Sequence, residues 1–148
     1  MIGIDPCSKS WELAEARANQ AKVKVEFIEG SAENIPLASA SVDSVLITFT
    51  LCTVPNPQAA LAEARRMLKP DGKLFFCEHG IAPDERVAKW QRRINPLWKR
   101  VFGGCHITRD TRTLLQEAGF GIDAIAQMYL PGTPAAAGFN TWGEAAIA

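Results

Sequence analysis

The chain has 148 residues, of which 47% are hydrophobic and 22% are charged, so it can bury a core and is not intrinsically disordered. Sixteen Lys and Arg balance sixteen Asp and Glu, which excludes a basic nucleic-acid binder along the whole chain and an acidic tail. No apolar run approaches the roughly 20 residues that span a bilayer. The start, Met1 to Asp5, lacks the basic flank of a signal peptide, so we expect a cytoplasmic protein.

The cysteines lie far apart in the sequence, at Cys7, Cys52, Cys77 and Cys105. None forms a C-x-x-C pair, and we expect all four to be reduced thiols. A zinc site is conceivable from one set of side chains, namely Cys77, His79, Cys105 and His106. Their spacing matches no known zinc module, so we predict no metal.

The first third of the chain alternates between strands and a helix. Residues 2–4 predict a short strand, which Asp5 and Pro6 end. Ser8 is typical of a helix N-cap, and the helix is expected to continue to about Gln20. Residues 23–28 predict the next strand, and residues 31–41, with Pro36, predict a loop.

The middle of the chain contains a continuous apolar run at residues 42–51, which is typical of a strand buried on both faces of a parallel sheet. Pro55 and Pro57 open a helix with apolar residues at helical spacing. Residues 69–72, Lys-Pro-Asp-Gly, predict the end of that helix and a turn. Residues 73–78 predict another strand.

The last third begins with a helix predicted over residues 84–102. We expect it to be bent or broken near Pro96 and to bury one stripe, made of Val87, Trp90, Ile94, Trp98, Val101 and Phe102. Either Thr108 or Asp110 caps a final helix that ends at Ala118. Residues 120–130 and 138–147 predict two strands that pair with each other.

This alternation predicts an α/β fold with a mostly parallel sheet and an antiparallel hairpin at the C-terminal end. Ligands of such sheets bind at the carboxyl ends of the strands. The loops that matter are therefore those after Ile4, Ile28, Thr50 and Cys77.

The first two of these loops carry candidate nucleotide contacts. Asp5 can accept hydrogen bonds from a ribose diol, and it can equally serve as a turn residue before Pro6. Ser31 and the Ala32 amide can meet the edge of a base, and the alternative role for Ser31 is an ordinary helix cap.

The two later loops carry candidate chemistry. Thr48 and Cys52 end the buried strand, where such residues are more often core or turn residues, and no His adjoins Cys52 to make it a nucleophile. Glu78 and His79 follow the next strand. His79 is a candidate base or substrate contact, with a structural histidine as the alternative.

Four segments together resemble class I methyltransferases that depend on S-adenosylmethionine (SAM), of the small methyltransferase type 11 group. They are the segments 2–5, 27–36, 41–45 and 64–74. The later segments 90–98 and 103–111 are similar to the branch that contains thiol methyltransferase-like proteins. The resemblance implies a Rossmann-like fold, SAM as cofactor and a single, incomplete domain over residues 1–148.

The resemblance also implies residue roles. Asp5 would bind the ribose of SAM, Pro6 and Cys7 would line the adenine pocket, and Ser31 and Ala32 would meet the adenine edge, although many relatives carry Asp at the position of Ser31. Three residues would border the methionine part, namely Thr48, Phe49 and Leu51. The acceptor side would be faced by His79, Cys105 and His106, with His79 and His106 as the catalytic candidates.

One motif of the family is missing. The family's main SAM contact is a G-x-G-x-G loop after a central strand, and this chain contains neither that motif nor the strand before it. Without that strand, the strands ending at Asp5 and near Leu51 must pair directly or expose unpaired edges. We expect a chain truncated at its N-terminus, with a degenerate or complementing polypeptide as the alternative.

Basic residues gather between Asp84 and Arg112, where eight Lys and Arg face three acids and leave an excess of +5. Trp90, Trp98 and Phe102 lie among them. Three roles fit this pattern: a core-facing stripe with a solvated face, a lid over an acceptor pocket, or peripheral contact with an anionic membrane through residues 84–102. No aromatic platform suggests nucleic-acid binding, so we expect none.

Two functions are therefore compared. The first is methyl transfer from SAM to a small, apolar acceptor such as a thiol, with phospholipid amines or quinone-like molecules as alternative acceptors. The second is a non-catalytic, methyltransferase-like module that binds a protein or a membrane surface through residues 84–112.

Overall fold

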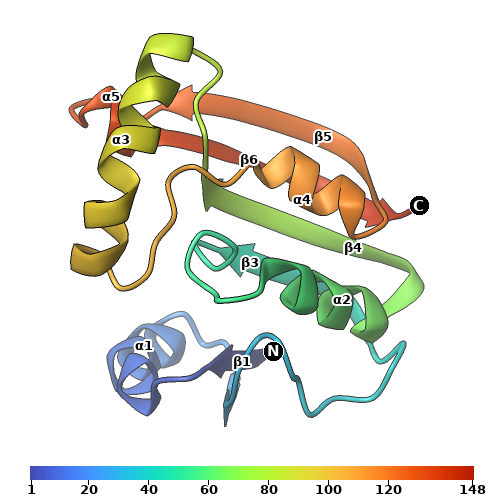
Figure 1. Cartoon of the computed structure of the whole chain (residues 1–148). Coiled ribbons are helices and arrows are strands. Elements are labelled where there is room, and N and C mark those ends of the chain that lie inside the picture. The colour runs from blue at the N-terminus through green and yellow to red at the C-terminus, as the bar shows by residue number, and fades with distance from the viewer.

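The computed structural model describes residues 1–148 and alternates strands with helices (Figure 1). In chain order the elements are β1 (Ile2–Asp5), α1 (Ser8–Gln20), β2 (Glu26–Glu29), β3 (Val42–Thr48), α2 (Pro57–Met67), β4 (Leu68–His79), α3 (Glu85–Val101), α4 (Thr111–Glu117), β5 (Phe120–Tyr129), α5 (Ala135–Gly138) and β6 (Phe139–Ile147). The predicted α/β class is confirmed. No helix combines the length and the apolar character needed to cross a bilayer.

The strands form two separate sheets. β1 and β2 pair in parallel, and the larger sheet has the order β3-β4-β6-β5. Within it β3 and β4 are parallel, whereas β6 runs antiparallel to both β4 and β5. The predicted C-terminal hairpin is therefore confirmed, and the larger sheet is mixed.

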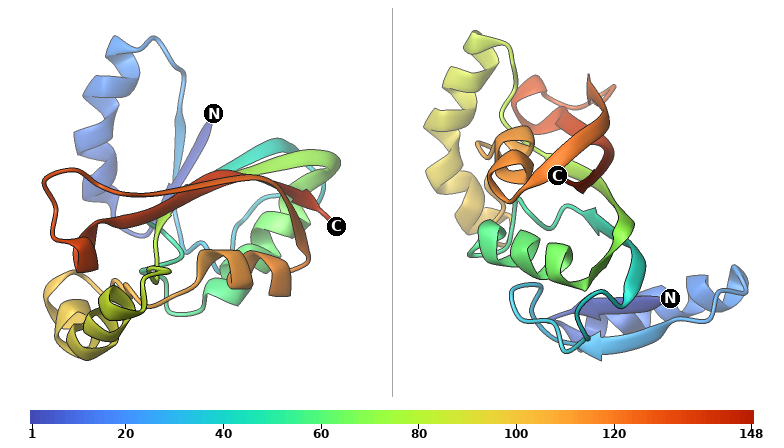
Figure 2. Two further views of the ribbon diagram at one scale, coloured as in Figure 1. Left: turned by 90° about the horizontal axis from the view of Figure 1, so that it is seen from above. Right: turned by 90° about the vertical axis from the view of Figure 1, so that its right-hand side faces the viewer.

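A break in the sheet lies between β1 and β3. These strands do not pair, so each keeps one edge without a strand partner. The two-stranded sheet lies beyond β3, on the side away from β4 (Figure 2). Of the two outcomes expected for a chain without the family's central strand, the structure shows unpaired edges.

The core lies on the face of the larger sheet that α2 and α4 cover. Its fully buried members include Leu51, Leu61, Leu74 and Leu115. α2 contributes its apolar stripe at the expected helical spacing. The opposite face carries exposed apolar side chains, with Leu46 exposed by 69%.

Several predicted boundaries were wrong for local reasons. Cys7 rather than Ser8 is the N-cap of α1, and its side chain makes no cap bond. The strand before Gly30 begins at Glu26, because the Val23 amide donates to Ala18 and extends the helix end. β3 stops at Thr48, because Phe49 takes a positive φ of 50°.

The predicted turn at residues 69–72 lies instead within β4, which begins at Leu68. The ladder with β3 shifts register there, since Val42 faces Leu68 but Ser44 faces Lys73. This early extension buries Leu68 to 3% exposure. The gain in buried apolar area explains why the strand begins so soon after α2.

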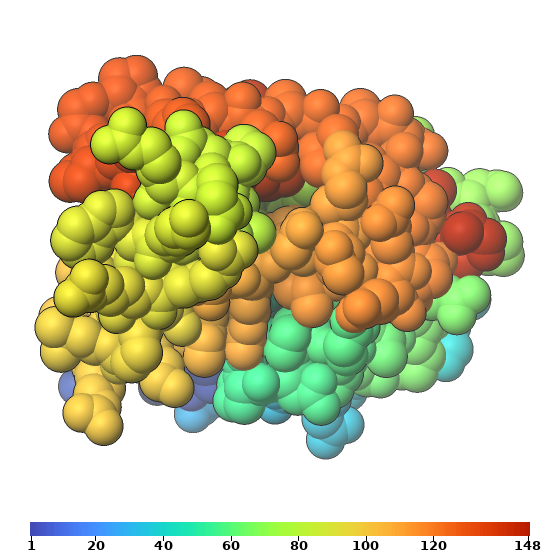
Figure 3. All heavy atoms as spheres, turned by 45° about the horizontal axis from the view of Figure 1, so that its top comes forward, coloured from blue at the N-terminus to red at the C-terminus, as the bar shows by residue number.

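α3 runs through Pro96 without a break, and Asp84 caps it by accepting from the Arg86 and Val87 amides. Its buried residues are Ala88 and Gln91. The predicted stripe is divided: Val87, Ile94 and Trp98 are half-buried, whereas Trp90, Val101 and Phe102 are exposed. Trp90 is exposed by 60%, and the helix stands on the molecular surface (Figure 3). Asp110, not Thr108, caps α4.

Candidate functional site

The carboxyl end of β1 presents Asp5. Oδ1 of this half-buried carboxylate accepts a hydrogen bond from the Cys7 amide at 2.7 Å, and Oδ2 accepts none from the protein. Asp5 therefore shapes the turn and still offers one oxygen to a ligand. Pro6 and Cys7 follow it and are exposed.

The loop after β2 holds Ser31 and Ala32. The Ser31 hydroxyl donates to the Glu33 carboxylate at 3.4 Å and accepts from the Glu33 amide at 3.2 Å, so it closes a local turn. Ala32 is half-buried. Glu33 also accepts from the Asn56 amide at 2.5 Å, which ties this loop to the start of α2.

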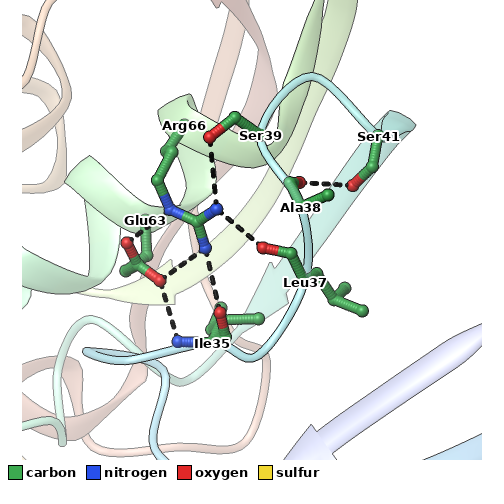
Figure 4. Close-up of polar contacts among 7 residues, drawn as sticks. All are labelled: Ile35, Leu37, Ala38, Ser39, Ser41, Glu63 and Arg66. Atoms are coloured by element: carbon green, nitrogen blue, oxygen red, sulfur yellow. Dashed lines mark hydrogen bonds and ion pairs between the residues drawn. The ribbon is translucent and has the colours of Figure 1, made fainter.

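An ion pair on α2 holds the rest of that loop (Figure 4). Glu63 accepts from the Ile35 amide at 2.8 Å, and Arg66 donates to the carbonyls of Ile35 and Leu37. Hydrogen bonding to Arg66 lowers the pKa of Glu63 to about 2, with help from the Ile35 amide. The Glu63–Arg66 pair thereby fastens the loop between β2 and β3 to α2.

A strained aromatic residue, Phe49, directly follows the carboxyl end of β3. Phe49 is exposed by 46%, and its ring centroid lies 4.7 Å from that of His79. A positive φ is unfavourable for a bulky residue, so the surrounding structure must hold Phe49 in this strained conformation. Thr48 is exposed beside it, whereas the Leu51 side chain packs in the hydrophobic core, so it does not line the open edge.

Glu78 fixes the loop that follows β3. Its buried carboxylate accepts from the Thr50 amide at 2.8 Å and from the Cys52 amide at 3.1 Å. Burial raises the pKa of Glu78, and the backbone amides partly offset that rise. Sequence reasoning missed this role, because the partners lie 26 to 28 residues earlier in the chain.

Two cysteines and a histidine meet next to this loop. The ligand atoms of Cys52, His79 and Cys105 all lie within 4.8 Å of one another, and Nδ1 of His79 is 3.8 Å from Sγ of Cys105. The hydrogen bond between the thiols raises the pKa of Cys52 and lowers that of Cys105, and His79 adds to the second effect. The buried pair thus favours one thiolate, at Cys105.

His106 lies beside the same group. Its amide donates to the Cys52 carbonyl at 2.6 Å, and its half-buried imidazole has a pKa lowered by burial and then by Arg109 and Lys99. The structure therefore brings His79, Cys105 and His106 to one place. It adds Cys52 and leaves Cys77 outside the cluster. One sequence signal was available, since Cys52 and His79 both follow neighbouring strands of the sheet.

The residues present fit only part of SAM. The open oxygen of Asp5 and the loop after β2 suit the ribose and adenine end. The chain holds no G-x-G-x-G loop for the methionine end. A surface hollow of about 550 Å³ lies elsewhere, between α2, α4 and the end of β6.

Comparisons with known proteins found a matching family and similar proteins. The family model of the methyltransferase domain matches residues 1–76. The thiol S-methyltransferase TMT1B of Rattus norvegicus is 40% identical over 111 residues, which cover 73% of this chain and 46% of that protein. The demethylmenaquinone methyltransferase of Paenarthrobacter aurescens is 29% identical, with coverage of 68% and 36%. This chain thus spans about half the length, or less, of these curated relatives.

Two solved structures share the fold. The SAM-dependent methyltransferase of Methanosarcina mazei has a TM-score of 0.75 and 22% identity over 97% of this chain and 80% of its own. That of Aquifex aeolicus has a TM-score of 0.63 and 18% identity over 99% and 68%. The predicted Rossmann-like fold is confirmed.

Proposed function

Because this chain belongs to the family of SAM-dependent methyltransferases, we propose that it transfers the methyl group of SAM to a small thiol. The observation that carries the proposal is that Asp5 ends β1, Phe49 follows β3 and packs against His79, and His79 ends β4, so all three lie at the carboxyl ends of parallel strands. Asp5 and Phe49 lie within the segment that the family model matches, and His79 lies just after it. Ligands of α/β sheets bind at this edge.

Asp5 is proposed to hold the ribose of SAM through its open oxygen, and Ser31 and Ala32 to lie along the adenine. Thr48 and Phe49 are proposed to border the methionine part and to keep water from the methyl group. When bound, SAM supplies a methyl group that is already activated on a sulfonium sulfur, so the residues of the chain chiefly position the two reactants.

A thiol acceptor is supported by the relatives and by the site. Two kinds of relative named as thiol S-methyltransferases, TMT1A and TMT1B of Homo sapiens, are 36% and 38% identical to this chain. A thiol needs only to lose its proton before attack, and the imidazoles of His79 and His106 are proposed to take it. The new S–C bond forms as the sulfonium C–S bond breaks, which leaves a thioether and S-adenosylhomocysteine.

The test is methyl transfer from methyl-tritiated SAM to hexanethiol, with hexanol as the matched acceptor that differs only in its sulfur. We expect labelled thioether from the thiol and no product from the alcohol. His106→Asn should lower the rate by about 100-fold or more, as loss of a proton acceptor does. Labelling of a quinol or an amine in place of the thiol would contradict the proposed acceptor.

A second proposal concerns α3. Its outward side chains include Trp90, Leu97 and Val101, each exposed by 60% or more, and Arg93 lies over the Trp90 ring at 5.8 Å. Apolar side chains among basic ones suit an anionic membrane surface. We propose that α3 rests on such a surface and thereby brings the site close to apolar acceptors.

A further inference from the structure

We propose that Cys52, His79 and Cys105 form a zinc site whose fourth position takes the acceptor thiol. The inference deepens the proposed function and, for the role of the thiol, rests on it. It also departs from the expectation of no metal, because the structure brings Cys52, distant in the sequence, to His79 and Cys105.

The first argument is geometric. Tetrahedral zinc, with bonds of about 2.3 Å to sulfur and about 2.0–2.1 Å to nitrogen, places its ligand atoms about 3.6–3.8 Å apart. Nδ1 of His79 and Sγ of Cys105 are 3.8 Å apart, and all three ligand atoms lie within 4.8 Å. Side-chain adjustments of less than about 1 Å would therefore complete the site.

The second argument is that separate parts of the backbone hold the ligands in place. Cys52 is fixed by its amide to Glu78 and by its carbonyl to the His106 amide. Cys105 follows Gly103 and Gly104, whose φ values of 59° and 91° turn the chain back toward Cys52. These hydrogen bonds and turns fix the backbone from which the two cysteine side chains project.

The third argument is charge and solvation. Two thiolates and one neutral imidazole compensate the charge of Zn²⁺, so the site that holds zinc without the acceptor is neutral where Cys52 and Cys105 are exposed by only 1% and 8%. The Trp98 indole N–H nearby is buried without a hydrogen-bond partner. It packs against Cys105 and Ile107 and is placed to stabilise a metal-bound thiolate.

Three protein ligands leave a fourth position, as in catalytic rather than structural zinc sites. His79 is half-buried and lies against the exposed Phe49, so this position is reached from the edge where SAM is proposed to bind. A thiol that binds zinc releases its proton and remains bound as the thiolate. In that case His79 holds the metal, and His106 remains as the proposed proton acceptor.

The experiment uses the whole chain, reduced and freed of metal, titrated with Co²⁺ as a spectroscopic probe and then with Zn²⁺ as a competitor. We expect one Co²⁺ per chain with the intense visible bands of tetrahedral coordination and with sulfur-to-cobalt charge transfer. Zn²⁺ should displace it. Addition of hexanethiol should change the charge-transfer band.

Variants distinguish this site from adventitious binding. Cys52→Ser and Cys105→Ser should each weaken Co²⁺ binding by more than about 100-fold. That loss exceeds the one expected when a residue that only supports a ligand is changed. Cys77→Ser, on the same strand as His79 but outside the cluster, should bind as tightly as the unaltered chain. If circular dichroism shows that the cysteine variants do not fold, Co²⁺ affinity is measured in His79→Gln instead, because His79 is only half-buried. This variant should also bind Co²⁺ more weakly than the unaltered chain.

A weak octahedral Co²⁺ spectrum would overturn the proposal, and so would a loss of Co²⁺ affinity in Cys77→Ser equal to that in the two cluster variants. A chain that forms a Cys52–Cys105 disulfide, and that takes up no metal once the disulfide is reduced, would overturn it as well. The Co²⁺ spectrum is measured without any methyl transfer. A failure of the metal proposal can therefore be distinguished from a failure of the proposed methyltransferase activity. A chain that binds Zn²⁺ but methylates no thiol keeps the metal site and loses the proposed acceptor.

Discussion

Single residues at the site differ in how far the sequence predicts them. Asp5 and His79 are visible in the sequence, because each polar side chain follows a strand pattern directly. The positive φ of Phe49 and the bonds of Glu78 to a distant loop are not visible, because both depend on tertiary packing. For the same reason Cys52 was read as a core or turn residue, although its thiol meets Cys105 and His79.

Glu63 gives a prediction about pH at this scale. Its pKa is lowered to about 2 in the folded chain from an ordinary value of 4.5, so its stabilising effect is full above about pH 4.5. That effect is lost as the pH falls through 2. Glu63→Gln should reduce the free energy of unfolding by about 1–2 kcal/mol at pH 7, after allowance for the 19% exposure of the side chain.

Chemical denaturation at several pH values measures the difference in the free energy of unfolding between the unaltered chain and Glu63→Gln. It should shrink between about pH 5 and pH 2, and Glu12→Gln on the exposed surface of α1 should show no comparable loss. A difference that stays constant across this range would contradict the role given to the Glu63–Arg66 pair.

At the scale of elements, capping residues and hydrophobic periodicity predicted which helices and strands exist better than they predicted where each begins and ends. Asp110 and Asp84 cap α4 and α3, as their residue type favours. The packed face of α3 was predicted only in part: Ile94 and Trp98 pack against the small core of buried residues at Cys52, Cys105 and Ile107, whereas Trp90 and Val101 are exposed. Helical spacing alone fits a stripe through Trp90 and Val101 as well as it fits the one through Ala88 and Gln91. The hydrogen bonds of Gln91 to Gly80 and Ala82 decide between the two faces.

The outward face of α3 is tested with vesicles. The chain should sediment with vesicles that contain phosphatidylglycerol and not with vesicles of phosphatidylcholine alone, and added salt should weaken this binding. Trp90→Ala and Leu97→Ala should each lower the partition coefficient by about 10-fold, since each removes one apolar anchor. Leu13→Ala on α1, exposed by 81%, is the matched control. Equal losses in all three variants would contradict a specific role for α3.

At the scale of the whole molecule, the sequence predicted the α/β class and the C-terminal hairpin. What it left open was whether β1 and β3 would pair or stand apart. They stand apart, joined through the loop that Glu63 and Arg66 fasten to α2 rather than through a sheet ladder. The proposed cofactor site is therefore divided between the two sheets, and its integrity depends on that loop.

The most direct test of the account is calorimetric titration of the 148-residue chain with SAM. We predict binding that Asp5→Ala weakens by about 10- to 100-fold, the loss expected for a charged hydrogen bond to the ribose. Asp71→Ala, an exposed carboxylate in β4, should leave it unchanged. The absence of binding by a chain that circular dichroism shows to be folded, or equal loss in both variants, would contradict a SAM site at the end of β1.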